Sequence, residues 1–177
     1  MRPVTGLALV VLALARPAGA ATVDPKPLVV GPAEVPRGFR VDPDETGLRT
    51  NALEARESPQ TRPLFRRWGR VTGYQVRYEG RDDASIEARV DLFRTARGAR
   101  GLHRWVLREM QKAGIKGLVR APAHLGSEGT LYSYGRYVIV YWRHGRAWSA
   151  LAGFEVSKNR TLAAARAQQR RIAAALG

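Results

Sequence analysis

The sequence predicts an α+β domain in which helices pack against an antiparallel sheet. Two stretches, 71–79 and 86–92, alternate apolar and polar residues with the period of two that marks half-buried strands. The stretch 95–113 instead repeats its apolar residues with the period of a helix. The order strand, strand, helix recurs in the second half, where a hairpin at 136–155 precedes a final helix. This order of strand pairs and helices is typical of the α+β class.

The first residues of the chain, 1–20, have the features of a secretory signal peptide. A basic start is followed by an apolar run at 4–15 and by small residues at 18–20 that form an A-x-A cleavage pattern. A membrane anchor is the alternative, but an Arg-Pro pair at 16–17 ends the run well short of the roughly 20 residues that a spanning helix needs. We therefore expect an exported chain beginning at Ala21, secreted or periplasmic. Without cysteine it can be neither a lipid-anchored lipoprotein nor a disulfide-bonded domain.

The mature chain is expected to form one domain. Residues 21–36 are rich in proline and predict an extended leader outside the core, followed by a single α+β domain at 37–177. A short strand is expected at 38–41. Residues 42–67 are polar, and their Asp-Pro-Asp and Ser-Pro sequences signal turns, with a short helix at 48–56 between them.

The strands 71–79 and 86–92 should pair as a hairpin that leads into the longest predicted helix of the middle of the chain. That helix begins at Thr95, whose hydroxyl is suited to cap the first turn, and ends before Gly114. Two glycines near its start are expected to loosen its first turns. One side of the helix is apolar and is expected to face the core: Leu102, Val106, Ala99, Met110, Ala113 and Leu107.

The second half should begin with a loop at 122–129 and a short strand at 131–134. Both faces of the following hairpin are apolar, as in a central strand pair that is covered on both sides. Either helices cover both faces, or one face lines a cavity. The turn is predicted at 144–145, which places Tyr141 opposite Trp148. Thr161 is expected to cap the final helix, which ends at Leu176.

No catalytic or metal-binding constellation emerges, and we predict no catalytic residue, no metal and no cofactor. His103 borders the apolar side of its helix and is expected to be a hydrogen-bonded core residue, whereas His144 is expected in a turn. His124, in a loop, is the one histidine that is a site candidate. Ser127 lacks nucleophile-elbow spacing because Leu125 stands where a glycine is required. The acidic residues are expected mostly on exposed strand faces and in the N-terminal segment.

The strongest functional feature is a basic stripe along helix 95–113. An ordinary exposed helix face mixes charges, because like charges three or four residues apart repel. Two plain explanations compete with function: carboxylates elsewhere in the fold pair with the stripe, or a GC-rich genome favours arginine wherever solvent allows. The functional interpretation is an anion-binding surface, which Arg66, Arg67, Arg143 and Arg146 could extend. The stripe, with Trp105 at its edge, comprises Arg97, Arg100, Arg104, Arg108 and Lys112.

Aromatic residues gather in and before the second hairpin. Packing in the core explains them most simply. The alternative is the wall of a ligand pocket, where tyrosine hydroxyls would supply the few polar groups that such sites need. The candidate pocket residues are Tyr132, Tyr134, Tyr137, Tyr141 and Trp148.

Several short motifs resemble those of exported proteins from GC-rich bacteria: Pro-Arg-Gly-Phe at 36–39, Trp-Gly-Arg-Val-Thr-Gly-Tyr at 68–74 and Leu-Gly-Ser-Glu at 125–128. The second half, with its V-x-V-x-W-R strand, tight turn and alanine-rich helix, is similar to LpqN-type lipoproteins and to the extracellular sensor domain of the kinase PknH. It is more remotely similar to PsbP-like proteins. Over residues 68–175 the resemblance implies a PsbP-like α/β/α sandwich with a binding or sensing role, and it carries over no catalytic residue. The chain departs from the lipoproteins in lacking their anchoring cysteine.

The excess of basic over acidic residues, a formal net charge of +15, predicts attraction to anionic partners. We therefore expect an exported, non-catalytic binding module that uses the basic helix face to bind anionic lipid, a cell-envelope polymer or another acidic macromolecule. The alternative is a sensor or binding domain for a small apolar or amphipathic ligand. Export makes nucleic acid an improbable partner, and a hydrolase ranks last.

Overall fold

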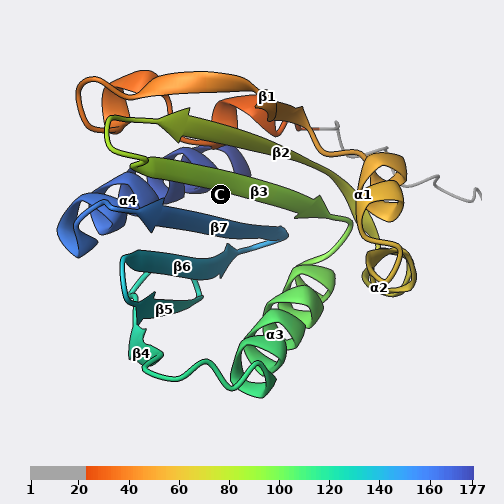
Figure 1. The fold of residues 1–177 in the computed structure, drawn as a ribbon. Helices are drawn as coiled ribbons and strands as arrows, with labels where there is room; N and C mark the ends of the chain where they lie inside the picture. The colour runs from red at the N-terminus through yellow and green to blue at the C-terminus, as the bar shows by residue number, and fades with distance from the viewer. Residues whose placement is uncertain (1–22) are drawn as a thin grey trace, which may run out of the picture.

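The computed structural model describes residues 23–177 and shows a seven-stranded sheet with helices on both faces (Figure 1). The strands are β1 (Arg40–Leu48), β2 (Arg70–Glu79), β3 (Ser85–Phe93), β4 (Val119–Pro122), β5 (Glu128–Tyr134), β6 (Tyr137–His144) and β7 (Ala147–Phe154). The helices are α1 (Asn51–Glu57), α2 (Thr61–Trp68), α3 (Ala96–Lys112) and α4 (Lys158–Leu176), with short 3-10 turns η1 (Lys26–Leu28) and η2 (Pro32–Glu34). The predicted signal peptide at 1–20 lies outside the described residues. None of the helices within 23–177 is long and apolar enough to cross a membrane.

The sheet order is β1-β2-β3-β7-β6-β5-β4, and all neighbouring strands run antiparallel. Helix α4 packs on one face, where Trp142 and Ile172 belong to the larger core cluster. Helix α3 packs on the other, where Leu102 and Trp148 belong to a second cluster (Figure 1). Because both faces of the β6–β7 hairpin are covered, the first of the two predicted explanations for its two apolar faces is confirmed. The predicted α+β class with an antiparallel sheet is likewise confirmed.

The edge strand β1 is longer than the short strand predicted at 38–41. It includes Asp42, Pro43 and Asp44, which were interpreted as a turn, so that prediction is wrong. The pairing with β2 shifts register between Asp42 and Gly47. Proline has no N–H to donate to a neighbouring strand, so within sheets it occurs mainly in edge strands and at bulges. Pro43 lies in an edge strand and at an irregularity of its pairing.

The polar stretch after β1 folds into two helices where one was predicted. The hydroxyl of Thr50 accepts a hydrogen bond from the Leu53 amide at 3.1 Å and caps α1, close to the predicted helix at 48–56. Helix α2 was not predicted. Gly69 ends it in the left-handed conformation, with φ of 66°, which glycine adopts without strain.

Helix α3 matches its prediction, and the Thr95 hydroxyl caps it by accepting from the Gly98 amide at 3.1 Å. Its N-terminal half is packed more tightly than expected. A Cβ on Gly98 would lie 2.1 Å from the Trp68 carbonyl oxygen, and one on Gly101 would lie 2.5 Å from the Trp68 ring. The two glycines therefore allow α2 to approach α3 closely and do not loosen the helix.

The turn of the second hairpin lies one residue later than predicted. Its two residues are Gly145 and Arg146, so Tyr141 faces Ala150 and the predicted pairing with Trp148 is wrong. Gly145 takes the first turn position with φ of 52°, a value that favours glycine. The register shift is two residues, which leaves every side chain on its predicted face.

The final helix begins before the predicted cap. The Ser157 side chain accepts from the Arg160 amide, whereas Thr161 is fully buried and donates its hydroxyl proton to the Ser157 carbonyl at 3.1 Å. The prediction of Thr161 as the cap is therefore wrong, since its methyl and hydroxyl groups face the protein interior.

The proline-rich segment before β1 is part of the core, contrary to the predicted leader. Both η1 and η2 lie against α4. Leu28 and Val30 are buried, and the Tyr78 hydroxyl donates to the Val30 carbonyl at 2.9 Å. Prolines prevent regular helix and strand here, but they do not prevent the apolar side chains between them from packing.

Candidate functional site

The predicted basic stripe lies on the solvent side of α3, and all five of its basic residues are exposed. Arg100 lies 3.6 Å from Glu128, and Lys112 lies 3.0 Å from Glu109. The other three members, Arg97, Arg104 and Arg108, have no carboxylate within ion-pair distance in residues 23–177. We call Arg97, Arg100, Arg104, Arg108 and Lys112 the α3 ridge.

Trp105, predicted at the edge of the stripe, is a packing residue. Its ring lies 6.5 Å from that of Trp68, between α3 and α2. It is half-buried against the second core cluster, so it joins the two helices and presents only part of its surface to solvent.

The predicted extensions of the basic surface are only partly present. Arg66 and Arg67 are exposed on α2, next to α3. Arg143, however, is buried and ion-paired with Glu128 at 2.9 Å, so it cannot contact a ligand and its prediction is wrong.

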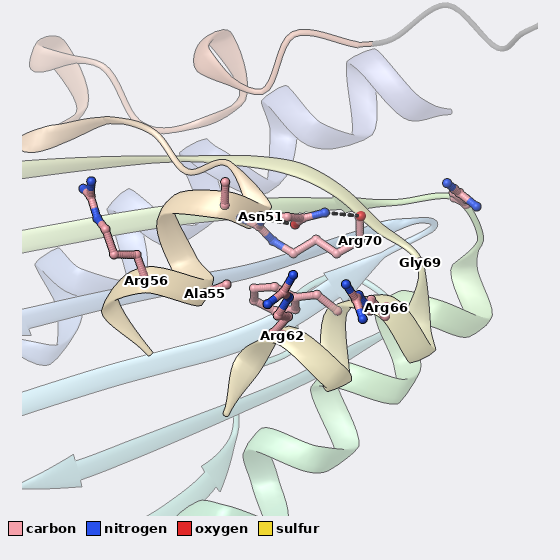
Figure 2. A pocket seen from close by; sticks show the side chains of 10 residues that line it. Asn51, Ala55, Arg56, Arg62, Arg66, Gly69 and Arg70 are labelled. Carbon is pink, nitrogen blue, oxygen red and sulfur yellow. Dashed lines mark hydrogen bonds between the residues drawn. The ribbon is translucent and has the colours of Figure 1, made fainter. Parts of the chain in front are cut away.

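A cleft lies between α1 and α2 and has a volume of about 650 Å³. None of its lining residues is acidic. Figure 2 shows Arg62 and Arg66 rising side by side from α2 toward Asn51 and Arg70, while Arg56 points outward from α1. The residues that line it are Asn51, Ala52, Ala55, Arg56, Arg62, Phe65, Arg66, Gly69, Arg70 and Arg94.

Beneath this cleft a buried network of ion pairs joins the sheet to α1. Asp91 lies 2.6 Å from Arg70 and 3.1 Å from Arg89, and Arg89 also reaches Glu54 at 3.1 Å. Arg49 in turn pairs with Glu54 at 2.7 Å and with Glu57. Burial alone would raise the pKa of Asp91, but the adjacent Arg89 and Arg70 hold that pKa below its ordinary value.

This network corrects the expectation that the acidic residues lie on exposed strand faces. Asp91 has no exposed surface, and Glu54 is 5% exposed. The missed signal is that Asp91 alternates with Val90 and Leu92, so β3 carries its acidic residue on the face that α1 covers. A Cβ on Gly73 would lie 2.1 Å from the Asp91 carboxylate, so glycine at that position makes room for the network.

The histidines lie apart. His103 is buried as predicted, but its Nδ1 has no hydrogen-bond partner in the described part of the chain. Burial lowers the pKa of His103; nearby Glu128 opposes this shift, whereas Arg143 and Arg120 add to it. His124 is exposed in its loop, and His144 ends β6, with Nδ1 3.1 Å from Gln169. Across residues 23–177, no three His, Asp or Glu side chains are grouped to hold a metal ion.

The candidate pocket aromatics are divided between the core and the surface. Tyr141 stacks on Trp148 with ring centroids 5.9 Å apart, and Tyr132 meets Tyr141 edge-on at 6.1 Å. Tyr132 and Trp148 are buried, and burial raises the pKa of Tyr141 to about 12. Tyr134 and Tyr137 are each 46% exposed. These contacts describe a packed layer beneath α3 with two tyrosines at its open edge.

No protein-family model matches the chain, and no curated protein matches its sequence. Its structure is similar to the extracellular domain of PknH from Mycobacterium tuberculosis, with a TM-score of 0.53 and 11% sequence identity. The match covers 85% of this chain and 97% of that domain. At this identity the likeness establishes the fold alone. The resemblance to the PknH domain is thus confirmed for the fold, while those to LpqN-type lipoproteins and PsbP-like proteins stay predictions.

Proposed function

We propose that this protein is an exported, non-catalytic binding module that docks on an anionic surface through the α3 ridge. The observation that carries the proposal is the exposure of Arg97, Arg104 and Arg108 on one side of α3 without a carboxylate partner in residues 23–177. Like charges at this spacing repel one another, and an anionic partner would relieve that repulsion. The PknH domain to which the fold is similar is extracellular, which fits an exported module.

The arginines that hold the fold together are placed differently from those of the ridge. Arg49, Arg70 and Arg89 each pair with a carboxylate in the network beneath the α1–α2 cleft. The arginines that stabilise the fold are thus ion-paired with carboxylates, whereas three of the five basic residues of the ridge have no carboxylate partner in residues 23–177. The ridge also lies on one exposed helix face, a shape suited to a flat partner such as a membrane with anionic lipids.

The test is binding to vesicles that contain phosphatidylglycerol, compared with vesicles of neutral phosphatidylcholine. A basic residue near an anionic leaflet contributes about 1 kcal/mol. Replacing Arg97, Arg104 and Arg108 by glutamine should therefore weaken binding by roughly 100-fold. Wild-type binding should also fall as salt rises, because salt screens exposed charges.

The matched control removes the same charge from the opposite side of the sheet. Arg160, Arg166 and Arg170 are exposed on α4, and replacing them by glutamine should leave most of the vesicle binding intact. Equal loss in both triple variants would mean that net charge alone drives binding, and the assignment to α3 would be wrong. Binding of anionic polymers but not of vesicles would move the proposed partner from lipid to a cell-envelope polymer.

A further inference from the structure

The cleft between α1 and α2 differs in shape from the α3 ridge. Small-molecule sites are concave and enclose roughly 300–1,000 Å³, and this cleft encloses about 650 Å³. Its apolar part includes Phe65, which is buried and lies under the Arg70 guanidinium at 4.5 Å. An open helix face suits a flat partner, whereas this cleft has the volume for a compact ligand.

Positive charge around the cleft is in excess, because the nearby carboxylates are paired with other arginines. The acidic residues nearest to it, Glu54, Glu57 and Asp91, are already engaged by Arg49, Arg70 and Arg89 in the network below. No carboxylate in residues 23–177 lies within ion-pair distance of the cleft's other arginines. These are Arg56, Arg62, Arg66 and Arg94.

Two of these arginines are placed to act together. Arg62 and Arg66 stand one helical turn apart on α2, so their charges repel unless an anion lies between them (Figure 2). Arg70 adds a buried group: its side chain has no exposed surface, and its Nε has no acceptor in the described chain. A ligand oxygen or a water molecule is the usual partner of such a donor, and Arg143 Nε and the ring N–H groups of Trp142 and Trp148 are further donors without an acceptor in the described chain.

We propose that the α1–α2 cleft is a binding site for a compact ligand bearing phosphate or pyrophosphate, distinct from the α3 ridge. Guanidinium groups hold phosphate oxygens in pairs of parallel hydrogen bonds, and several of them converging on one volume match a group with more than one negative charge. Arg62 and Arg66 bind the phosphate oxygens. The Asn51 side chain lies beside them and is held by Arg70, donating to its carbonyl at 2.9 Å and accepting from its Nη1 at 2.7 Å. Phe65 with the α1 alanines contacts the carbon part of the ligand. The phosphate belongs either to a free small molecule or to a lipid headgroup.

The experiment is calorimetric titration of the purified protein with inorganic pyrophosphate. We expect saturable binding at one equivalent, and the double variant Arg62→Gln/Arg66→Gln should weaken it at least about tenfold, since charge-assisted hydrogen bonds are lost. Arg104→Gln/Arg108→Gln is the matched control, because it removes the same charge at the same spacing on α3. Arg62→Lys/Arg66→Lys keeps the charge without the planar fork and should fall between the two. Thermal unfolding of each variant verifies that the exposed substitutions leave the fold intact.

The outcomes separate this site from the proposed docking surface. Loss of pyrophosphate binding in the α2 variant alone supports the site, and unchanged vesicle binding by that variant identifies a free phosphorylated ligand. If the α2 variant also loses binding to phosphatidylglycerol vesicles, the bound phosphate is that of a lipid headgroup. The proposal is overturned if pyrophosphate does not bind at low salt, or if the α3 control weakens its binding equally. Failure of the ridge to bind vesicles leaves the pyrophosphate result standing.

Discussion

Asp91 occupies the centre of the buried network, where its carboxylate meets both Arg70 and Arg89. Removing one partner from such a group leaves the others charged and without compensation in a poorly solvated place, which is more damaging than replacing the whole group by apolar residues. The network also fixes α1 on the sheet through Glu54. The position of Arg70 at the base of the α1–α2 cleft therefore depends on Asp91, Arg89 and Glu54, which do not line the cleft.

Replacing Asp91 by asparagine should lower the free energy of unfolding by about 3–5 kcal/mol, the range for breaking a buried ion pair. Because Arg89 and Arg70 lower the pKa of Asp91, its contribution is present above about pH 4 and is lost as the pH falls through that lowered pKa. Urea denaturation at neutral pH measures the change. Glu79→Gln, on the exposed end of β2, is the control and should change stability by less than about 0.5 kcal/mol.

Single residues were predictable where a pattern reports on exposure. The helical period correctly placed Arg97, Arg104 and Arg108 in solvent. It could not find the α1–α2 cleft, because Arg62 and Arg66 lie in a segment whose Pro-containing sequence predicts turns. Residues four apart lie on the same face of a helix, so the spacing of Arg62 and Arg66 could indicate a shared site only if a helix was predicted there. Asp91 was misjudged since alternation separates two strand faces but does not say which face a distant helix covers.

At the scale of elements, α3 and α2 meet through Gly98 and Gly101, which border Trp68. Glycine in a helix is less favourable than alanine by up to about 1 kcal/mol. Its presence here is explained by the contact, because the space for a side chain is filled by the Trp68 backbone and ring. The relative placement of the ridge and the cleft follows from this contact, since α3 carries one and α2 forms a wall of the other.

The variant Gly98→Ala tests how closely α2 packs against α3, because helix propensity and steric contact change its stability in opposite directions. Helix propensity alone predicts stabilisation, but the new Cβ would lie 2.1 Å from the Trp68 carbonyl oxygen, which cannot move without its helix. Overpacking of this kind destabilises by about 1–3 kcal/mol, so we expect a lower melting temperature. The same substitution at Gly47, where a Cβ meets nothing within 4 Å, should not lower it by a comparable amount. A stabilised Gly98→Ala variant would show that α2 is not held closely against α3.

The elements with a clear period were predicted, namely β2, β3, α3, the β6–β7 hairpin and α4. Those missed were β4, which is too short to show a period, α2, which follows a Ser-Pro sequence that indicates a turn, and the buried η1–η2 segment. For that segment, Pro25, Pro27 and Pro32 indicated an irregular backbone correctly, but irregular structure was equated with exposure. Burial of Leu28 and Val30 depends on α4 and β2, elements far away in sequence.

In the whole molecule, the two faces of the sheet have different roles. The α4 face holds the larger apolar core with the N-terminal segment, and the other face combines a small aromatic cluster with the buried charges. Both proposed sites lie in the layer formed by α1, α2 and α3 (Figure 1). The exposed arginines of the two proposed sites can thus be replaced without disturbing the larger apolar core.

The whole fold should become less stable between pH 7 and pH 5 because of one side chain. His103 is 1% exposed and its pKa is lowered by burial, so the native state takes up the proton at lower pH than the unfolded chain, whose histidines titrate near about 6.5. The unfolded state binds more protons in this range, and the free energy of unfolding therefore falls as pH falls below about 6.5, until the lowered pKa is reached.

Denaturation by urea at a series of pH values measures this slope. His103→Gln, which cannot titrate, should have a flatter profile than the wild type, whatever its absolute stability. His124→Gln, at an exposed loop position, should keep the wild-type profile. An unchanged slope in His103→Gln would mean that His103 takes up its proton equally well in the folded protein, and α3 would then have to be more open to water around His103 than its burial indicates.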